Sequence, residues 1–312
     1  DLVLRNNRTD EANPLGIFHP HNEHHNIKKE NIGLIEVMGL AVLPGRLKME
    51  MRKIAEFLKD EDFKKKIFED KDTQKHLAWL KAFINKYPNV KNLSVEFPNE
   101  NSRLTAVNGV SFELYSGVSL GIVGESGSGK SMLVSALIGL LPRNALFSAD
   151  EVKFDGKNLV DISEKDMVKL RGRDISMIFQ DPAASLSPTD TIGKQLSEVF
   201  SLHEGLKKRE ADEKSIDMLN KVGINESRLR MKQYPHELSG GMLQRVMIAM
   251  ALACKPKLLI ADEPTTALDV TTQKQILILI KELCEELNTA AIIISHDLRI
   301  IAEVSDRVIV MK

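Results

Sequence analysis

The residues of this chain that are best suited to chemistry form a glycine-rich run near its middle, with the spacing G-x-x-x-x-G-K-S. The run consists of Gly124, Glu125, Ser126, Gly127, Ser128, Gly129, Lys130 and Ser131. Glycine lets successive backbone N–H groups converge on phosphate oxygens. We expect Lys130 to contact β- and γ-phosphates and Ser131 to bind Mg²⁺. A turn that binds nothing has no need of Lys followed by Ser, so the run predicts a phosphate-binding loop.

A second apolar run, residues 258–261, ends in two adjacent carboxylates, Asp262 and Glu263. In open α/β sheets, ligands bind at the carboxyl ends of the strands. We expect Asp262 to hold Mg²⁺ through its water shell and Glu263 to polarise the water that attacks the γ-phosphorus. An exposed Asp-Glu pair at a strand end is common in proteins, and the glycine-rich loop is what favours this interpretation here.

The elements that must position these residues alternate between short apolar runs and helical patterns from residue 92 onward. Such alternation predicts βαβ units around a parallel sheet, hence an α/β fold. Between about residues 190 and 250 the pattern becomes helical and rich in Lys and Glu, which predicts a helical insertion. The apolar runs are continuous, as is typical of strands covered by helices on both faces; they span residues 118–123, 176–179, 258–261 and 290–294.

The composition excludes several classes of protein. Among the 312 residues, 43% are hydrophobic, and 43 Lys and Arg residues stand against 44 Asp and Glu. This balance disfavours a strongly basic nucleic-acid binder, so no nucleic-acid partner is expected. The longest uncharged stretch, residues 131–142, is too short for a helix that spans a bilayer, which needs about 20 residues. Cys254 and Cys284 cannot form a disulfide framework, so a reduced, cytoplasmic setting is expected.

The composition and the apolar periodicity of the sequence change near residue 90, which predicts two domains, 1–90 and 91–312. We expect the first to be small and mostly helical, because apolar residues recur at helical spacing between residues 46 and 87. About 90 residues of this kind form only a marginal core alone. A Pro- and His-rich loop precedes them, and it suits either a zinc site or, as we favour, a solvated loop. Its histidines are His19, His21, His24 and His25.

From about residue 91 to the end, the chain resembles the ATP-binding subunit of ABC transporters. The run Leu238-Ser239-Gly240-Gly241-Met242 is similar to the signature motif LSGGQ of that family, with Met in place of Gln. Gln180 resembles the glutamine of the Q-loop, Asp269 the aspartate of the D-loop, and His296 the switch histidine. The resemblance implies the fold of a P-loop NTPase (RecA-like), with a parallel sheet core and an inserted helical subdomain.

The resemblance also implies roles for these residues toward ATP. In a head-to-tail pair of such subunits, Ser239 and the two glycines after it would face the γ-phosphate bound by the opposite copy. Gln180 would contact Mg²⁺ and the attacking water, and His296 would bind the γ-phosphate and align Glu263. Phe97 would be the aromatic residue that stacks on adenine, although an aromatic residue at a strand end is often part of the core.

Within that family, three segments resemble the subunits of dipeptide and oligopeptide importers. They are residues 106–112 (AVNGVSF), 180–182 (QDP) and 234–242 (YPHELSGGM). The resemblance implies a second ATP-binding subunit, identical or not, transmembrane permease subunits and, indirectly, an extracytoplasmic substrate-binding protein. The chain would then be a peripheral protein on the cytoplasmic face of the plasma membrane. Because members of the family continue beyond the position of Lys312, we expect the chain to be truncated at its C-terminus.

Residues 13–87 resemble part of a bacterial UDP-glucose–hexose-1-phosphate uridylyltransferase, on a segment that contains Phe18-His19-Pro20-His21. Transferases of that family use a nucleophilic histidine in a His-Pro-His-x-Gln setting. Glu23 stands at the Gln position here, so no nucleophile is expected. An ATP-binding subunit has no physical need for such a segment. We therefore interpret the chain as a join between fragments of two genes, either natural or introduced when the sequence was assembled.

Two rival functions stay open at this point. A soluble ABC ATPase of DNA repair or translation would carry long coiled coils, zinc modules or two tandem cassettes, and the sequence has no such pattern. A uridylyltransferase, or an inactive interaction module, is the second rival. A comparison of ATP hydrolysis with UDP-sugar exchange separates these possibilities.

Overall fold

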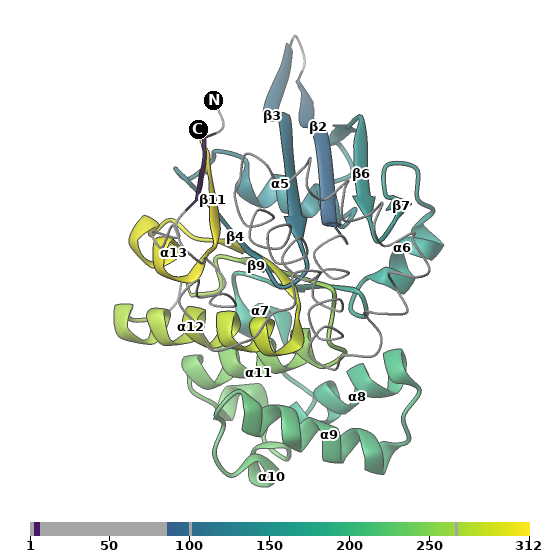
Figure 1. Cartoon of the computed structure of the whole chain (residues 1–312). Coiled ribbons are helices and arrows are strands. Elements are labelled where there is room, and N and C mark those ends of the chain that lie inside the picture. The colour runs from purple at the N-terminus through teal and green to yellow at the C-terminus, as the bar shows by residue number, and fades with distance from the viewer. Residues whose placement is uncertain (1–2, 7–85, 100–101, 266–267) are drawn as a thin grey trace, which may run out of the picture. The chain divides into compact units, whose positions relative to one another are not determined.

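The computed structural model describes residues 3–6, 86–99, 102–265 and 268–312 (Figure 1). The chain divides into two compact units, one formed by Asp1–Asn7 and Asn85–Lys312 and the other by Arg8–Ile84. The second unit lies outside the described residues, and so do the predicted N-terminal helices, the four clustered histidines and the segment that resembles a uridylyltransferase. The first unit contains the phosphate-binding loop and all the other predicted site residues.

A six-stranded sheet forms the centre of the first unit, with the strand order β1-β11-β4-β10-β9-β8. The five strands from β11 to β8 pair in parallel, which confirms the predicted parallel sheet. At the edge, β1 pairs antiparallel with β11. The strands are β1 (Val3–Asn6), β4 (Ser119–Gly124), β8 (Ile175–Ile178), β9 (Leu258–Asp262), β10 (Ala290–Ile294) and β11 (Arg307–Met311).

The central strands are buried on both faces, as their continuous apolar sequences require. Every residue of β9 and β10 is buried. Helices α11, α12 and α13 contact β8, β10 and β4 respectively, and α5 contacts β4 and β9. Because parallel strands end at the same edge of a sheet, the residues that follow β4, β8, β9 and β10 gather there. The helices are α5 (Lys130–Leu137), α11 (Gly240–Leu252), α12 (Val270–Leu287) and α13 (Leu298–Val304).

A second, antiparallel sheet lies beside α5, which contacts strands of both sheets (Figure 1). Its strand order is β3-β2-β6-β7, and β5 pairs with β2. The first of these strands begins at Lys86, before the predicted domain boundary at residue 90. The apolar pattern of the sequence does not reveal this sheet, because register shifts between β2 and β3 interrupt the regular alternation. The strands are β2 (Lys86–Asn99), β3 (Ser102–Tyr115), β5 (Leu146–Ser148), β6 (Glu151–Phe154) and β7 (Lys157–Asn158).

Helices also occupy most of the segment between β8 and β9. Their packing buries Phe200 and Leu219, and Gly205 ends α8 in a left-handed backbone conformation, with φ of 69°. Across the described ranges, none of the helices has both the length and the apolar character that a bilayer span demands. The remaining helices are α6 (Glu164–Leu170), α7 (Pro182–Ser185), α8 (Ile192–Glu204), α9 (Lys208–Lys221) and α10 (Ser227–Arg230), with a 3-10 turn at Pro235–Glu237.

Candidate functional site

The glycine-rich loop connects β4 to α5, and its shape depends on glycine at two positions. A Cβ on Gly124 would lie 2.3 Å from the carbonyl oxygen of Met311, and a Cβ on Gly129 would lie 2.1 Å from that of Ala106. Gly129 also has φ of 87°, in the left-handed region. Only glycine fits at both positions. The loop therefore packs directly against the backbone of β11 and β3.

Lys130 begins α5 and folds back over the loop. Its ammonium donates to the carbonyl oxygens of Gly124, at 2.9 Å, and of Glu125, at 2.8 Å. The residue is only 6% exposed. Ser128 Oγ is buried as well, and it has no hydrogen-bond partner among the described residues. The loop thus offers a buried cation, an unpaired hydroxyl and a helix N-terminus, all of which favour an anion.

Ser131 and Asp262 form a pair beside the loop. Ser131 Oγ donates a hydrogen bond of 3.1 Å to Asp262 Oδ1. Burial raises the pKa of the Asp262 carboxyl above its ordinary value; the hydrogen bond from Ser131 and the charge of Lys130 oppose the rise, and the charge of Glu263 adds to it. Hydroxyl and carboxylate oxygens are ligands that Mg²⁺ takes in proteins, so this pair fits a magnesium ion.

Glu263 stands between Gln180 and His296. Gln180 Nε2 donates to Glu263 Oε2 at 3.3 Å, and His296 Nδ1 lies 3.9 Å from the same oxygen. The side chain of His296 is 64% exposed and that of Glu263 is 22% exposed. The structure thus brings together the three residues that the sequence predicts to be catalytic, at the ends of the adjacent strands β8, β9 and β10.

The backbone of Glu263 adopts a conformation that the sequence does not predict. Its φ is 45°, in the left-handed region. The N–H of Glu263 donates to the carbonyl of Ile294 at 3.1 Å, and its own carbonyl accepts from the N–H of Thr265 at 2.7 Å. Residues other than glycine are uncommon in this region, and such conformations cluster at functional sites.

Gln180 and His296 are each followed by an aspartate that caps a helix. Asp181 accepts two backbone hydrogen bonds at the start of α7, at 2.9 and 3.1 Å. Asp297 does the same at the start of α13, at 2.8 and 3.3 Å. Each cap fixes the turn that presents the preceding side chain. These two positioning residues escape a search for motifs, although Asp before a helical pattern is itself an N-cap signal.

Ser239 is the N-cap of α11, so the residues that resemble the signature motif lie at the start of a helix. Its hydroxyl accepts a hydrogen bond from the N–H of Met242 at 3.4 Å. Ser239 and Gly240 are exposed, and Gly241 is half-buried. No hydrogen bond between described residues joins Ser239 to the glycine-rich loop of the same chain.

Asp269 is the N-cap of α12. Its two carboxylate oxygens accept from the N–H of Thr272, at 3.0 Å, and from the Thr272 hydroxyl, at 2.7 Å. The hydrogen bond from the hydroxyl is the main cause that lowers the pKa of Asp269 below its ordinary value. Thr272 Cγ2 lies 3.6 Å from where a Cβ on Gly241 would be, and Leu268 Cδ2 lies 3.7 Å from the corresponding point on Gly240. The turn at Asp269 therefore lies beside the two signature glycines.

Phe97 lies on β2 near the end of the long β2–β3 hairpin. It is half-buried and pairs in register with Leu104 of β3, which is 66% exposed. Two residues further along β3 is Ala106, whose carbonyl lies against Gly129. The hairpin that carries Phe97 therefore runs beside the start of α5.

Comparison with known families and proteins supports one assignment. Residues 107–266 match the family described as ABC transporter. The oligopeptide transport ATP-binding protein OppD of Escherichia coli (strain K12) is 55% identical over 223 residues, which are 72% of this chain and 66% of that protein. The dipeptide transport ATP-binding protein DppD of the same organism is 49% identical over 223 residues, with shares of 72% and 68%. This chain thus spans about two thirds of the length of these relatives.

Solved structures agree with the sequence relatives. The dimeric structure of a post-hydrolysis state of the ATP-binding cassette MJ0796, bound to ADP and Pi, matches with a TM-score of 0.64 and 28% identity, over 72% of this chain and 94% of that chain. The cbiO1 structure from Clostridium perfringens, part of the ABC transporter complex cbiONQ, matches with a TM-score of 0.62 and 31% identity, over 73% and 85%. The chain therefore belongs to the ABC transporter family.

Proposed function

We propose that this chain binds and hydrolyses ATP as a subunit of an ABC transporter and thereby energises the import of peptides. The observation that carries the proposal is the gathering of the glycine-rich loop, the Ser131–Asp262 pair and Glu263 at one edge of the parallel sheet. Phosphoryl transfer mainly needs positioning and stabilisation of charge. Residues at this edge are suited to both.

The loop binds the phosphates in the proposed reaction. Backbone N–H groups of Ser126 and Gly127 and the hydroxyl of Ser128 donate to phosphate oxygens, while the Ser128 N–H donates to the carbonyl of Glu125 at 3.2 Å. Gly124 and Gly129 give the loop the shape that this requires. The Lys130 ammonium exchanges its two carbonyl partners for oxygens of the β- and γ-phosphates. That exchange is favourable because hydrogen bonds between two charged groups are stronger than those to neutral carbonyls. Phe97 stacks on the adenine ring.

Ser131, Asp262 and Gln180 are the residues that hold Mg²⁺. When bound, the ion neutralises charge on the β- and γ-phosphate oxygens. Gln180 has an amide oxygen for the ion and an amide nitrogen that donates to Glu263. A nearby cation also favours the ionised carboxylate of Asp262, which burial otherwise disfavours.

Glu263 polarises the attacking water. Gln180 and His296 approach its Oε2 atom and fix the direction of the carboxylate. The imidazole of His296 has a second nitrogen, which donates to the γ-phosphate. Charged and polar groups held in place before the reaction contribute most when they need not reorganise.

A second ATP-binding subunit completes the site. Ser239 and the N–H groups of Gly240 and Gly241 bind the γ-phosphate held by the opposite copy, and Asp269 shapes the turn beside them. The exposure of Ser239 and Gly240 supports this arrangement, as does the description of the MJ0796 cassette as dimeric.

The remaining parts of the proposal concern transport. Transmembrane permease subunits form the path, an extracytoplasmic substrate-binding protein delivers the peptide to them, and this chain works at the cytoplasmic face of the plasma membrane. The names of its relatives, which are oligopeptide and dipeptide transport ATP-binding proteins, support a peptide as the solute.

The domain organisation is a proposal as well. It comprises an ATP-binding domain over residues 91–312, with a helical insertion at about 190–250, after an N-terminal segment of residues 1–90. The relation of residues 13–87 to a uridylyltransferase has no support from the family match or from the relatives described above, and it stays a prediction.

A titration of the purified chain with ATP, with and without Mg²⁺, tests the first step. We expect saturable binding that requires Mg²⁺ and that Lys130→Ala weakens. Uptake of a labelled peptide by cells that depend on this subunit tests the second step, with Lys130→Ala as the inactive control. If the chain binds ATP but the cells take up no peptide, the ATP-binding part of the proposal holds and peptide import is excluded as its function.

A further inference from the structure

We propose that Gln195 is a positioning residue for ATP hydrolysis. Its side-chain amide clamps the loop at residues 187–190, so that Gln180 and Ser239 of one chain are held as a single piece. This inference rests on the proposed function, because it concerns how two parts of that nucleotide site are linked.

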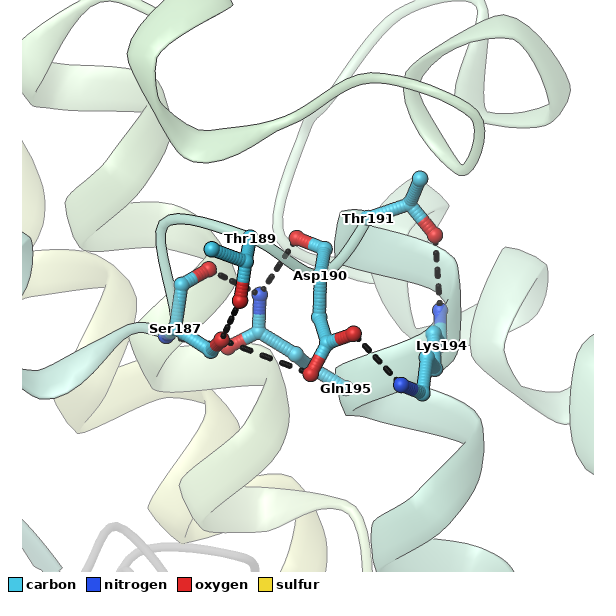
Figure 2. A network of polar contacts seen from close by, with 6 residues as sticks. All are labelled: Ser187, Thr189, Asp190, Thr191, Lys194 and Gln195. Atoms are coloured by element: carbon cyan, nitrogen blue, oxygen red, sulfur yellow. Dashed lines mark hydrogen bonds and ion pairs between the residues drawn. The ribbon is translucent and has the colours of Figure 1, made fainter.

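The clamp uses the whole amide group of Gln195 (Figure 2). Its Oε1 accepts from the N–H of Ser187 at 2.8 Å. Its Nε2 donates to the carbonyl oxygens of Ser187, at 3.0 Å, and of Asp190, at 2.9 Å. The side chain therefore binds both ends of the loop from the first turn of α8. Only an amide supplies an acceptor and two donors in this arrangement.

Other side chains close the same loop. Ser187 Oγ lies 3.2 Å from Thr189 Oγ1 and donates to Asp190 Oδ2 at 3.3 Å. Lys194 pairs with Asp190 at 2.5 Å, and the Thr191 hydroxyl caps α8 by accepting from the Lys194 N–H at 3.3 Å. Figure 2 shows that these six residues form one continuous network.

The loop at residues 187–190 is joined to Gln180 by a short segment that is itself held by hydrogen bonds. Asp181 caps α7 and thereby fixes the residues directly after Gln180. The Ser185 hydroxyl donates to the carbonyl of Asp181 at 2.7 Å, and Leu186 is buried. Ser187, the first residue of the clamp, follows immediately.

The start of α8 is also bonded to the segment before Ser239. The N–H of Ile192 donates to the carbonyl of Gln233 at 2.8 Å, and the N–H of Gly193 donates to that of Met231 at 2.8 Å. A Cβ on Gly193 would lie 2.6 Å from the same Met231 oxygen, so the two backbones are in direct contact.

The segment after Gln233 is fixed in turn. The N–H of Tyr234 donates to Glu237 Oε2 at 2.7 Å, and the N–H of Leu238 donates to the carbonyl of Pro235 at 3.1 Å. Ser239 follows as the cap of α11. Hydrogen bonds, joined by single peptide links between neighbouring residues, thus connect Gln180 through the clamp to Ser239.

The two ends of this set serve different nucleotides. Gln180 acts on the nucleotide of its own chain, and Ser239 acts on the nucleotide of the opposite copy. A displacement of Gln180 therefore displaces Ser239 only as long as the connection between them is stiff. Chains of packed side chains, hydrogen bonds and rigid elements can carry coupling between distant groups. Gln195 touches neither nucleotide, so it acts only through the residues it holds.

Hydrogen–deuterium exchange on the full unliganded chain tests the clamp directly. Gln195→Met removes all three hydrogen bonds, and Gln195→Glu removes the two donors while keeping the shape. Lys208→Gln is the matched control, because it changes the net charge by the same amount as Gln195→Glu and lies on α9, outside the network drawn in Figure 2. We expect faster exchange in residues 179–186 and in residues 231–239 for both Gln195 variants, and wild-type exchange for the control. An increase confined to residues 187–195 would overturn the proposal.

Kinetics separate positioning from a loss of stability. In variants whose circular dichroism and melting temperature match the wild type, we expect KM for ATP to stay unchanged and kcat to fall about tenfold, equivalent to about 1.4 kcal/mol. On a Gln180→Ala background, Gln195→Met is expected to cause a smaller further loss than it causes in the wild type, because part of its effect acts through Gln180. Additive losses would contradict the inference. If the wild-type chain hydrolyses no ATP, the proposed function fails, whereas the exchange experiment still decides whether Gln195 links the two segments.

Discussion

The acidic edge of the sheet and the start of α11 both belong to the candidate site, but they are built in opposite ways. At the acidic edge, burial disfavours the charge of Asp262, and Glu263 has a left-handed backbone. At the start of α11, Ser239 is an ordinary exposed helix cap. The neighbouring Asp269 caps α12 and has a lowered pKa, which is a favourable environment for a carboxylate.

The two regions therefore differ in how much of the site a single chain supplies. At the acidic edge, the charge of Asp262 is disfavoured in the free protein, and a bound cation such as Mg²⁺ would favour it. The signature region carries no such unfavourable charge, which agrees with the proposal that it binds a nucleotide only when a second copy presents one.

The largest effect is expected for Glu263→Gln. The amide keeps the size of the side chain but cannot polarise the attacking water as a carboxylate does. General-base groups contribute about 10²–10⁴-fold, so we expect kcat to fall by at least about 100-fold while the affinity for ATP stays unchanged. A phosphate-release assay and a binding titration measure the two quantities. Hydrolysis retained in the variant would remove Glu263 from the proposed role.

Lys130→Ala is expected to weaken binding itself. Loss of a buried charged partner costs at least about 2 kcal/mol, which corresponds to an affinity about 30-fold lower. Calorimetric titration with Mg-ATP measures the change. Lys257→Ala removes an equally charged side chain at the N-terminal end of β9, beside Asp155, and serves as the control with wild-type affinity. Equal losses of ATP affinity in both variants would mean that the overall positive charge of the protein, and not the position of Lys130 in the loop, attracts the nucleotide.

Ser239→Ala is expected to leave the affinity of a single chain for ATP unchanged. Hydrolysis should fall about tenfold, since a hydrogen bond to a charged group contributes about 1.5 kcal/mol. Measuring turnover over a range of protein concentrations checks the reason, because a site shared between two copies gives a rate per chain that rises with concentration. A fall in monomer affinity would show instead that Ser239 serves its own chain's nucleotide.

Asp262→Asn is expected to stabilise the free chain at neutral pH while it abolishes the effect of Mg²⁺ on ATP binding. The folded-state pKa of Asp262 lies above the unfolded value of about 3.9, so the charged carboxylate costs stability as pH rises through the folded pKa. Removing the charge should raise the melting temperature by a few degrees. Thermal denaturation at several pH values measures this, and the gain should shrink toward about pH 4. A gain that is independent of pH would point to packing as its cause.

The smallest effect is expected for Asp269→Asn, which should lower the melting temperature where Asp262→Asn raises it. Its lowered pKa means that the carboxylate stabilises the fold above the unfolded pKa, and that this contribution is lost as pH falls through the folded pKa. Asparagine also caps helices well, so we expect only a slight decrease in the melting temperature at neutral pH. The same denaturation series measures it. A decrease as large as that of Asp269→Ala would assign the stabilisation to the charge and not to the cap.

Much of this organisation could be predicted from the sequence, because the relevant residues are local. The strands that end at Gly124, Asp262 and Ile294 are continuous apolar runs, and the chemistry follows each run directly. Since parallel strands share an edge, the meeting of Gln180, Glu263 and His296 follows from the fold class.

Other features depend on contacts between distant residues and have no local pattern. The fit of Gly129 against Ala106 joins the loop to a hairpin that the apolar pattern does not reveal. The clamp at Gln195 is invisible in sequence, because an isolated glutamine on a helix is normally a solvated residue. The pKa of Asp262 depends on burial among residues from several strands.

The conformation of Glu263 has a consequence for attempts to redesign this protein. At its φ of 45°, glycine, asparagine and aspartate suit the backbone better than glutamate. Each of those residues would shorten or delete the group that reaches Gln180 and His296. A procedure that selects residues by backbone preference alone would therefore raise the stability of the fold at this position. The same substitution would remove the side-chain group that Gln180 and His296 approach.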